Sequence, residues 1–424
     1  MGLGQAAVEG LVSATEPACR FCSAPLTQTF VDLGLSPLAN SLLAEADLAR
    51  EEPRYPLHAY VCADCLLVQL GEFATPQDIF GDYVYFSSYS DSWVEHARRY
   101  VERMVERFGF DGDSSVVELA SNDGYLLQWF VERGVPVLGV EPAANVAAVA
   151  EEKGIPTVVR FFGEETARDL VAEGHRADLL IGNNVLAHVP ALNDFVAGLK
   201  VLLSTAGVVT MEFPHLLRLI EETEFDTIYH EHFSYFSALT VERVFAAHGL
   251  RLFDVEELPT HGGSLRIYAT HAEDVSHDDT RRVAELVERE RAAGLADLAT
   301  YSHFRERVRG VRQGLREFLE AARAEGRSVA AYGAAAKGVT LLNYCGIGPE
   351  LVEYVADRSP HKQDLYLPGV RLPIRSPEHV AETKPDYLLL LAWNLKDEIV
   401  EQMSYVREWG GRFVTPLPEV AVHE

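Results

Sequence analysis

The stretch Val116-Val-Glu-Leu-Ala-Ser-Asn-Asp-Gly124-Tyr-Leu-Leu decides the fold of this 424-residue chain. An apolar run ends in an acid and a tight turn, and a second apolar run with helical character follows. In an open α/β sheet, ligands bind beyond the carboxyl end of the strands, where such a turn lies. The pattern therefore predicts a first strand at Val116–Leu119 and a ligand site around the turn after it.

Short apolar runs and helix-length segments alternate through the region that follows. Further strands are expected at Val135–Val140, Thr157–Arg160, Ala177–Gly182 and Gly207–Phe213. This alternation is typical of a parallel sheet covered by helices on both faces. An antiparallel pair at Leu250–Glu256 and Ser264–Thr270, around Pro259-Thr-His-Gly-Gly263, is expected to extend that sheet.

A long charged segment without proline, residues 274–326, has the apolar spacing of helices that bridge two domains. A second α/β rhythm follows it. Its strands are expected at Ser328–Tyr332, Val352–Ala356, Val370–Pro373, Tyr387–Leu391 and Arg412–Thr415. The fold class is therefore α/β. We expect domain boundaries near residues 80 and 272. A small metal-binding segment would precede residue 80, and a second nucleotide-fold-like domain would follow the bridging helices.

Two cysteine pairs, Cys19-Arg-Phe-Cys22 and Cys62-Ala-Asp-Cys65, lie near the start of the chain. Each two-residue spacer lets both sulfurs approach one ion, and four thiolates fill the tetrahedron of a structural zinc. The same ligands would hold a rubredoxin-like iron, and one pair alone would suffice for a redox dithiol. A filled tetrahedron leaves no position for substrate, so the metal is expected to build a domain. Cys345 is predicted to be a buried apolar residue.

The charge balance limits the partners. The chain has 37 basic and 64 acidic residues, a formal net charge of −27. Nucleic acid and anionic membranes are excluded as partners, because binding to phosphates draws on a basic surface. The chain shows no basic start with a long apolar run and no stretch of about 18 apolar residues. We expect a cytoplasmic monomer with a small-molecule ligand.

The expected end of the second strand carries Glu141, 23 residues after Glu118. An acid there accepts hydrogen bonds from the hydroxyls of a ribose. Ala120 and Asn122 stand where a glycine-rich turn would approach a pyrophosphate, which disfavours a dinucleotide. A nucleoside without phosphates at that point, such as S-adenosylmethionine, suits the turn better.

The turn resembles the first motif of class I methyltransferases, although Gly124 alone is retained of its usual glycines. The resemblance implies that Asn183 and Asn184, after the fourth strand, face the amino-acid end and the methyl group of the cofactor. An unspecific turn with solvent-facing acids is the alternative. The expected cofactor-binding set is Glu118, Ala120, Asn122, Gly124, Glu141, Asn183 and Asn184.

With Tyr229-His-Glu-His-Phe-Ser-Tyr-Phe-Ser237 and Gly262-Gly-Ser-Leu-Arg266, nearly the whole chain resembles sugar carbon-methyltransferases that act on nucleotide-linked 4-keto-deoxysugars and branch the sugars of antibiotics. The resemblance implies a zinc-binding domain at residues 1–80 and a methyltransferase domain that binds S-adenosylmethionine at 81–272. Bridging helices and a Rossmann-like domain would fill 273–424. It also implies methyl transfer to carbon 3 of a TDP-linked 4-keto-2,6-dideoxysugar.

Methylation of carbon needs a base that removes a proton beside the ketone, so that the enolate can form. Histidine and tyrosine suit this task near neutral pH. We expect His232 to be the base, with Tyr229 as its substitute or relay and Glu231 orienting the site. His188 could hydrogen-bond the 4-keto oxygen as its charge grows. A hydrogen-bonded core strand is the alternative for this histidine-rich segment.

The sugar nucleotide would need local donors in so acidic a protein. The expected substrate-binding set is Asn40, Ser41, Tyr83, Phe86, Arg266 and Lys337. The glycine-rich turn Gly333-Ala-Ala-Ala-Lys-Gly338 could bind a substrate phosphate at a helix amino terminus or act only as scaffold.

Other functions stay open on these residues. An NAD-dependent sugar oxidoreductase would use the last domain, although its turn lacks Gly-x-Gly-x-x-Gly. A zinc-ribbon interaction module on a degenerate methyltransferase fold would bind the cofactor poorly. Relatives on the same scaffold that methylate nitrogen, or that decarboxylate without methyl transfer, would be expected to alter the Tyr229–His232 segment.

Overall fold

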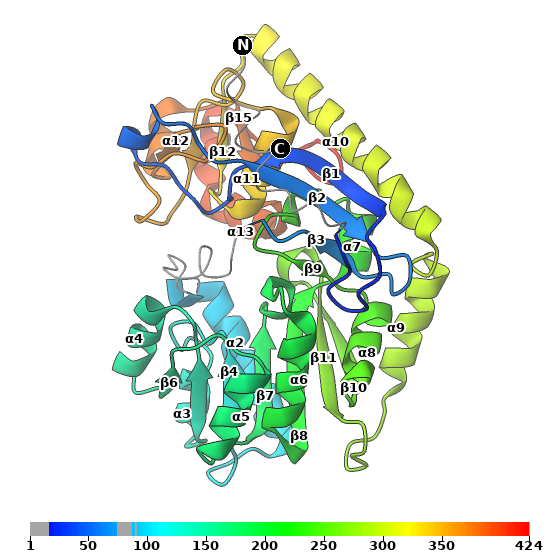
Figure 1. Ribbon diagram of the computed structural model, residues 1–424. Helices are drawn as coiled ribbons and strands as arrows, with labels where there is room; N and C mark the ends of the chain where they lie inside the picture. The colour runs from blue at the N-terminus through cyan, green and yellow to red at the C-terminus, as the bar shows by residue number, and fades with distance from the viewer. Residues whose placement is uncertain (1–16, 74–86, 90, 424) are drawn as a thin grey trace.

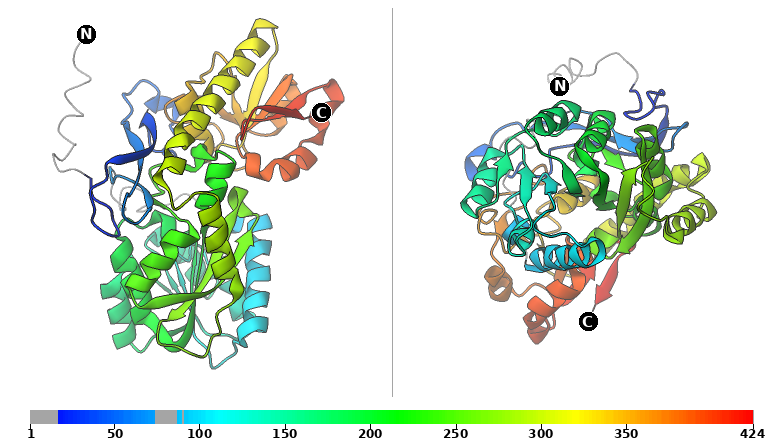
Figure 2. Two further views of the ribbon diagram at one scale, coloured as in Figure 1. Left: turned by 90° about the vertical axis from the view of Figure 1, so that its right-hand side faces the viewer. Right: turned by 90° about the horizontal axis from the view of Figure 1, so that it is seen from below.

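The computed structural model describes residues 17–73, 87–89 and 91–423, which form three β-sheets with helices around them (Figure 1). The N-terminal sheet and the C-terminal domain lie on the same side of the central domain, as Figure 2 shows from a second direction. The expected divisions at residues 80/81 and 272/273 stay predictions, and residues 80 and 81 lie outside the described part.

The N-terminal sheet is antiparallel, in the order β1-β2-β3-β9. Its strands are β1 (Gln28–Ser36), β2 (Tyr55–Val61), β3 (Val68–Leu70) and β9 (Ser234–Tyr235). β3 begins only at Val68, because Leu66 has φ +66° and still belongs to the turn after the second cysteine pair. β9 comes from the middle of the chain and pairs Tyr235 with Val68. The Tyr229–Ser237 segment is thus tied to the zinc-binding region.

The central sheet has seven strands in the order β10-β11-β8-β7-β4-β5-β6, and the first two are antiparallel to β8 or to each other. Its strands are β4 (Val116–Leu119), β5 (Val137–Val140), β6 (Thr157–Val158), β7 (Ala177–Asn183), β8 (Leu203–Pro214), β10 (Leu250–Leu258) and β11 (Ser264–His271). The predicted parallel strands and the antiparallel extension are confirmed. β4 is buried along its whole length, as expected for a strand covered on both faces.

Helices cover both faces of this sheet (Figure 2). They are α2 (Asp91–Phe108), α3 (Gln128–Val131), α4 (Ala144–Glu152), α5 (Glu164–Ala172), α6 (Leu192–Leu202) and α8 (Ala238–Ala247). The short helix α7 (Leu216–Glu221) lies beyond the end of β8, near the N-terminal sheet (Figure 1). Short 3-10 turns lie between elements: η1 (Glu45–Asp47), η2 (Ser87–Tyr89), η3 (Leu186–His188), η4 (Phe225–Thr227), η5 (Thr260–Gly262), η6 (Trp393–Leu395) and η7 (Ser404–Trp409).

Two helices, α9 (Arg281–Ala292) and the 27-residue α10 (Leu298–Ala324), bridge the central and C-terminal domains as predicted (Figure 1). α10 buries its apolar face and also packs on the N-terminal sheet, where the rings of Phe304 and Phe30 stack 4.5 Å apart. α10 therefore contacts both the N-terminal sheet and the C-terminal domain, and α9 packs on β10 of the central sheet. Within the described residues, no helix has both the length and the apolar character that crossing a bilayer requires.

The C-terminal sheet has the order β14-β13-β12-β15-β16-β17. Its strands are β12 (Val329–Tyr332), β13 (Val355–Ala356), β14 (Ile374–Arg375), β15 (Tyr387–Leu390), β16 (Arg412–Thr415) and β17 (Ala421–His423), with helices α11 (Ala336–Cys345), α12 (Glu378–Thr383) and α13 (Lys396–Gln402). The strand predicted at Val370–Pro373 is wrong: Arg371 has φ +55° and Pro373 lacks an amide hydrogen, so pairing starts at Ile374. The antiparallel edge strand β17 was not predicted. Cys345 is buried as expected, and burial raises its pKa to about 12.

Candidate active site and metal centre

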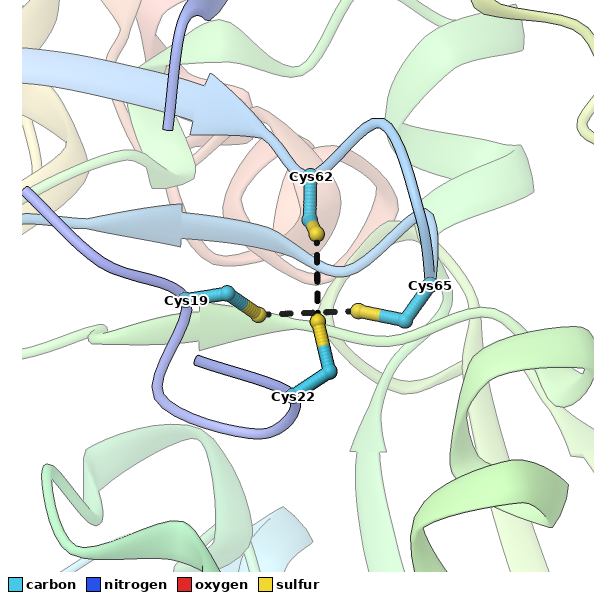
Figure 3. Close-up of side chains that lie close together, drawn as sticks. All are labelled: Cys19, Cys22, Cys62 and Cys65. Carbon is cyan, nitrogen blue, oxygen red and sulfur yellow. Dashed lines mark hydrogen bonds between the residues drawn. The ribbon is translucent and has the colours of Figure 1, made fainter. Parts of the chain in front are cut away.

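The four predicted metal ligands come together. The side chains of Cys19, Cys22, Cys62 and Cys65 point toward one another (Figure 3), and their sulfurs all lie within 4.8 Å of one another. The Sγ–Sγ distances are 3.5 Å for Cys19–Cys65 and 3.4 Å for Cys22–Cys62. Thiolates on a tetrahedral zinc, with bonds of about 2.3 Å, lie about 3.8 Å apart. The cluster thus fits a structural zinc, and all four of its positions are protein sulfurs.

A glutamine orients this cluster from outside. Gln69 of β3 is buried, and its Nε2 donates to the Sγ of Cys19 at 3.1 Å. Its Oε1 accepts from the backbone amide of Arg20 at 2.9 Å. Such outer contacts fix the orientation of metal ligands. Gln69 was not identified from the sequence, because nothing in the strand pattern distinguishes it.

The turn after β4 is held by Glu141, the acid that directly follows β5. Glu141 Oε2 accepts from the amide of Asn122 at 2.9 Å, and Oε1 accepts from the amide of Ala143 at 2.8 Å. Ala120 and Asn122 both have φ +51°, so the turn is tightly bent. Gly124 has φ +74°, and a Cβ there would meet Ile155 at 2.3 Å. The retained glycine is therefore required by packing as well as by backbone conformation.

Buried polar atoms gather at this end of the central sheet. Glu118 Oε2 and both side-chain polar atoms of Asn183 have no hydrogen-bonding partner within the described part of the chain. Burial raises the pKa of Glu118 well above its usual value, and the nearby carboxylates of Glu141 and Asp123 add to this. Buried polar groups are usually paired. These atoms fit a polar ligand such as S-adenosylmethionine at the carboxyl end of β4 and β7.

The structure brings together His188, which ends η3, and His232. Their ring centroids are 4.7 Å apart, and the Tyr229 ring lies 4.0 Å from that of His232. His232 Nδ1 lies 2.8 Å from the carbonyl oxygen of Thr227, which can only accept, so Nδ1 carries the hydrogen. Nε2 is then the basic nitrogen. Burial and, next, the neighbouring His188 lower the pKa of His232 well below its usual value; burial lowers that of His188 to about 4.

Glu231 meets the zinc-binding region. Asn40 Nδ2 donates to its Oε1 at 2.6 Å. Burial raises the pKa of Glu231 to about 7, against the opposing effect of Asn40. Ser41, the residue after Asn40, has an exposed side chain. Tyr83, and Phe86 with it, lie outside the described residues.

Lys337 and Arg266, the two cationic residues expected to bind the substrate, lie in different surroundings. Lys337 of α11 donates from Nζ to Asn394 at 2.8 Å and faces the buried acids Asp226 and Glu224. Burial lowers its pKa, which these acids oppose. Arg266 is buried in β11, where Glu212 at 2.9 Å and Glu256 at 3.2 Å already pair with it.

Because two carboxylates neutralise Arg266 inside the protein, we do not retain it as a phosphate-binding residue. Arg266 instead forms internal ion pairs that join β11 to its neighbouring strands β8 and β10.

His261 is a further residue of this region that sequence reasoning missed. It lies in η5 with φ +57°, an uncommon conformation for a residue with a side chain. Its Nε2 is 3.4 Å from Asn184 Nδ2, and its ring is 5.4 Å from that of Trp93. Burial lowers its pKa to about 4. In the sequence, a histidine directly before two glycines in a turn was the feature that could have identified His261.

Comparison with known proteins agrees with this geometry. Residues 19–80 match a domain described as "Putative zinc binding domain", 93–255 a "Methyltransferase domain" and 259–418 a "C-methyltransferase C-terminal domain". The chain is 39% identical to the C-methyltransferase NovU of Streptomyces niveus, over 95% of this chain and 96% of NovU.

Among solved structures, magnesium protoporphyrin IX methyltransferase from Synechocystis PCC 6803 is 14% identical and covers 42% of this chain and 83% of its own, with a TM-score of 0.34. A likeness this weak supports nothing further. The match to NovU spans both chains almost completely and includes the zinc-binding region. The chain belongs to the family of S-adenosylmethionine-dependent C-methyltransferases that carry an N-terminal zinc-binding domain.

Proposed function

We propose that the enzyme methylates carbon 3 of a TDP-linked 4-keto-2,6-dideoxysugar through an enolate. The observation that carries the proposal is the adjacent His188–His232 pair, in which the Thr227 carbonyl oxygen orients His232 with Nε2 as the basic nitrogen. Such a pair suits removal of a proton beside a ketone, whereas methylation of an amine nitrogen needs no carbon base.

His232 takes the proton from carbon 3 on Nε2, and the electron pair of the broken C–H bond moves onto the 4-keto oxygen. S-adenosylmethionine, when bound, would supply the methyl group as an electrophile; its carbon–sulfur bond would break, and the electron pair would stay on the sulfur of S-adenosylhomocysteine, the leaving group. The electron pair of the enolate then forms the new carbon–carbon bond, and the ketone returns. The proton leaves His232 for solvent after the product departs.

Three neighbours assist this step. His188, whose pKa burial lowers, donates a hydrogen bond to the enolate oxygen as its charge grows. Tyr229, whose ring lies against His232, is the substitute base or relay. Glu231, held by Asn40, orients the sugar.

The remaining predicted residues divide between cofactor and substrate. Glu141 would accept from the ribose hydroxyls, and Asn183 with Asn184 would face the amino-acid end of the cofactor. Asn40, Ser41 and Lys337 would hold the sugar nucleotide, with the Gly333–Gly338 turn near its phosphates. Membership of a C-methyltransferase family argues against the two alternatives, an NAD-dependent oxidoreductase and an inactive zinc-ribbon module.

The test is incubation with S-adenosylmethionine carrying an isotopically labelled methyl group and a TDP-linked 4-keto-2,6-dideoxyhexose. We expect the product mass to rise by one methyl group, and NMR to place the label on carbon 3. Absence of methylation with every such sugar, or a label on nitrogen or oxygen, would contradict the proposal.

A further inference from the structure

We propose that Arg20, the residue after the first zinc-ligand cysteine, is a positioning residue that fixes His188 and His232 relative to each other. The inference deepens the proposed function and rests on it, because it assigns catalysis to that histidine pair. Arg20 touches neither reacting atoms nor the metal, so its effect would pass through the backbone of the two catalytic segments.

The Arg20 guanidinium joins three segments that are distant in sequence. Its Nη1 donates to the carbonyl oxygen of Pro190, two residues after His188, at 3.0 Å. Its Nη2 donates to the carbonyl oxygen of Leu70, the last residue of β3. Its Cζ lies 5.4 Å from the centroid of the Phe233 ring, next to His232.

The same three segments also bond to one another. The amide of Phe233 donates to the carbonyl oxygen of Ala187 at 2.8 Å, and the amide of Leu70 donates to that of Phe233 at 3.0 Å. Ala187 precedes His188, and Phe233 follows His232. Each catalytic histidine therefore has a sequence neighbour in this small network, and Arg20 spans the network from the outside.

Arg20 is itself held from the metal side. Its amide donates to Gln69, whose Nε2 donates to the Sγ of Cys19. Its carbonyl oxygen accepts from Asn193 Nδ2 at 3.3 Å. A continuous set of contacts thus runs from a zinc thiolate to the histidine pair, and the zinc centre gains a role in the geometry of catalysis without taking part in the chemistry.

An arginine suits this position better than a lysine. The planar guanidinium donates to two carbonyls in fixed directions and lies against an aromatic ring, whereas an ammonium is a single flexible donor. A misplacement of about 1 Å between reacting groups costs about 100-fold in rate.

The experiment compares Arg20→Met and Arg20→Lys with a matched control, Arg50→Met. Arg50 belongs to the same region, is exposed, and its side chain pairs with Asp47 at 2.8 Å. We expect both Arg20 variants to keep one zinc per chain and the parental affinity for S-adenosylmethionine. The kcat for methyl transfer should fall about 10- to 100-fold in Arg20→Met, less in Arg20→Lys, and not at all in Arg50→Met.

A second measurement needs no substrate. Amide hydrogen exchange followed by mass spectrometry should be faster in peptides covering residues 186–190 and 229–235 of Arg20→Met, while the 62–66 knuckle keeps its protection. Loss of zinc, or faster exchange throughout the N-terminal sheet, would overturn the inference. Arg20 would then stabilise only the zinc-binding region around the four cysteines. Unchanged kcat and unchanged exchange would overturn it too.

The two proposals fail separately. If the parental enzyme methylates no TDP-linked keto sugar, the proposed function falls, and the exchange measurement still decides whether Arg20 holds the two segments. If the parental enzyme turns over and the Arg20 variants match it in rate and exchange, only the positioning role falls.

Discussion

Asn40 donates a hydrogen bond of 2.6 Å from Nδ2 to Oε1 of Glu231, although 191 positions separate the two residues. Asn40 lies in the zinc-binding region, and Glu231 directly precedes His232. Burial raises the pKa of Glu231 to about 7, and the bond from Asn40 opposes that rise. The contact therefore joins the zinc-binding region to the proposed catalytic segment, and it favours the ionised form of Glu231.

Asn40→Ala should raise the pKa of Glu231 further, because it removes a donor that favours the carboxylate. We expect the pH–rate feature that disappears in Glu231→Gln to move to higher pH in Asn40→Ala. The KM for the sugar nucleotide should rise by about 10-fold, the scale of one hydrogen bond to a charged group. Glu45→Gln, in the exposed η1 turn nearby, is the control. An unshifted profile would show that Asn40 does not act through Glu231.

His232→Ala should abolish methyl transfer and also the exchange of the carbon 3 proton with solvent, since both need the base. General-base catalysis contributes about 100- to 10,000-fold, so a loss on that scale is expected. His303→Ala on the exposed side of α10 is the matched control. Proton exchange at the parental rate in His232→Ala would move the base role to Tyr229.

The acid side of the pH profile follows from burial. Because burial and then His188 lower the pKa of His232, its neutral form persists as the pH falls below 6.5. In Glu231→Gln, which lacks the pH–rate feature of Glu231, we expect kcat/KM to hold its plateau below that pH. His188→Gln should shift the acid limb to higher pH by removing one lowering influence. An acid limb centred at 6.5 in the Glu231→Gln enzyme would contradict a lowered pKa of His232.

The same shift has a consequence for stability. A histidine whose pKa is lower in the folded chain binds its proton more readily when unfolded, so folding loses free energy as the pH falls below about 6.5. His232→Gln should flatten the dependence of Tm on pH in that window. This measurement needs no substrate and checks the pKa direction alone.

The sequence was informative wherever a pattern is local. Strand β4 and the four cysteines could be predicted because apolar runs and short ligand spacings reflect forces between near neighbours. β9 could not, since two residues form it and their partner strand lies far back in the chain. Nor could the burial of Arg266 between Glu212 and Glu256 be foreseen, because charge pairing across strands depends on register. The Asn40–Glu231 contact was missed as a pair for the same reason.

Glu141→Gln should weaken binding of S-adenosylmethionine by about 10- to 100-fold, measured by titration calorimetry. A glutamine has one acceptor oxygen where the carboxylate has two, so it cannot accept from both Asn122 and Ala143 as Glu141 does. The turn after β4 should then loosen. Glu151→Gln, exposed on α4, is the control. Equal affinity in both variants would show that Glu141 holds neither turn nor cofactor.

Cys62→Ser should remove the zinc and weaken binding of the sugar nucleotide without weakening binding of S-adenosylmethionine. The Asn40 loop and β3 would lose their anchor, so sugar-nucleotide binding should weaken, and methyl transfer should fall because β3 bonds to Phe233 beside His232. Affinity for S-adenosylmethionine should stay, since Glu141 and the turn after β4 belong to the separate central sheet. Cys345→Ala, which leaves the four-sulfur cluster intact, should keep zinc and both affinities. If Cys62→Ser loses both affinities equally, the zinc-binding region supports the whole fold, and the selective coupling to the sugar site is wrong.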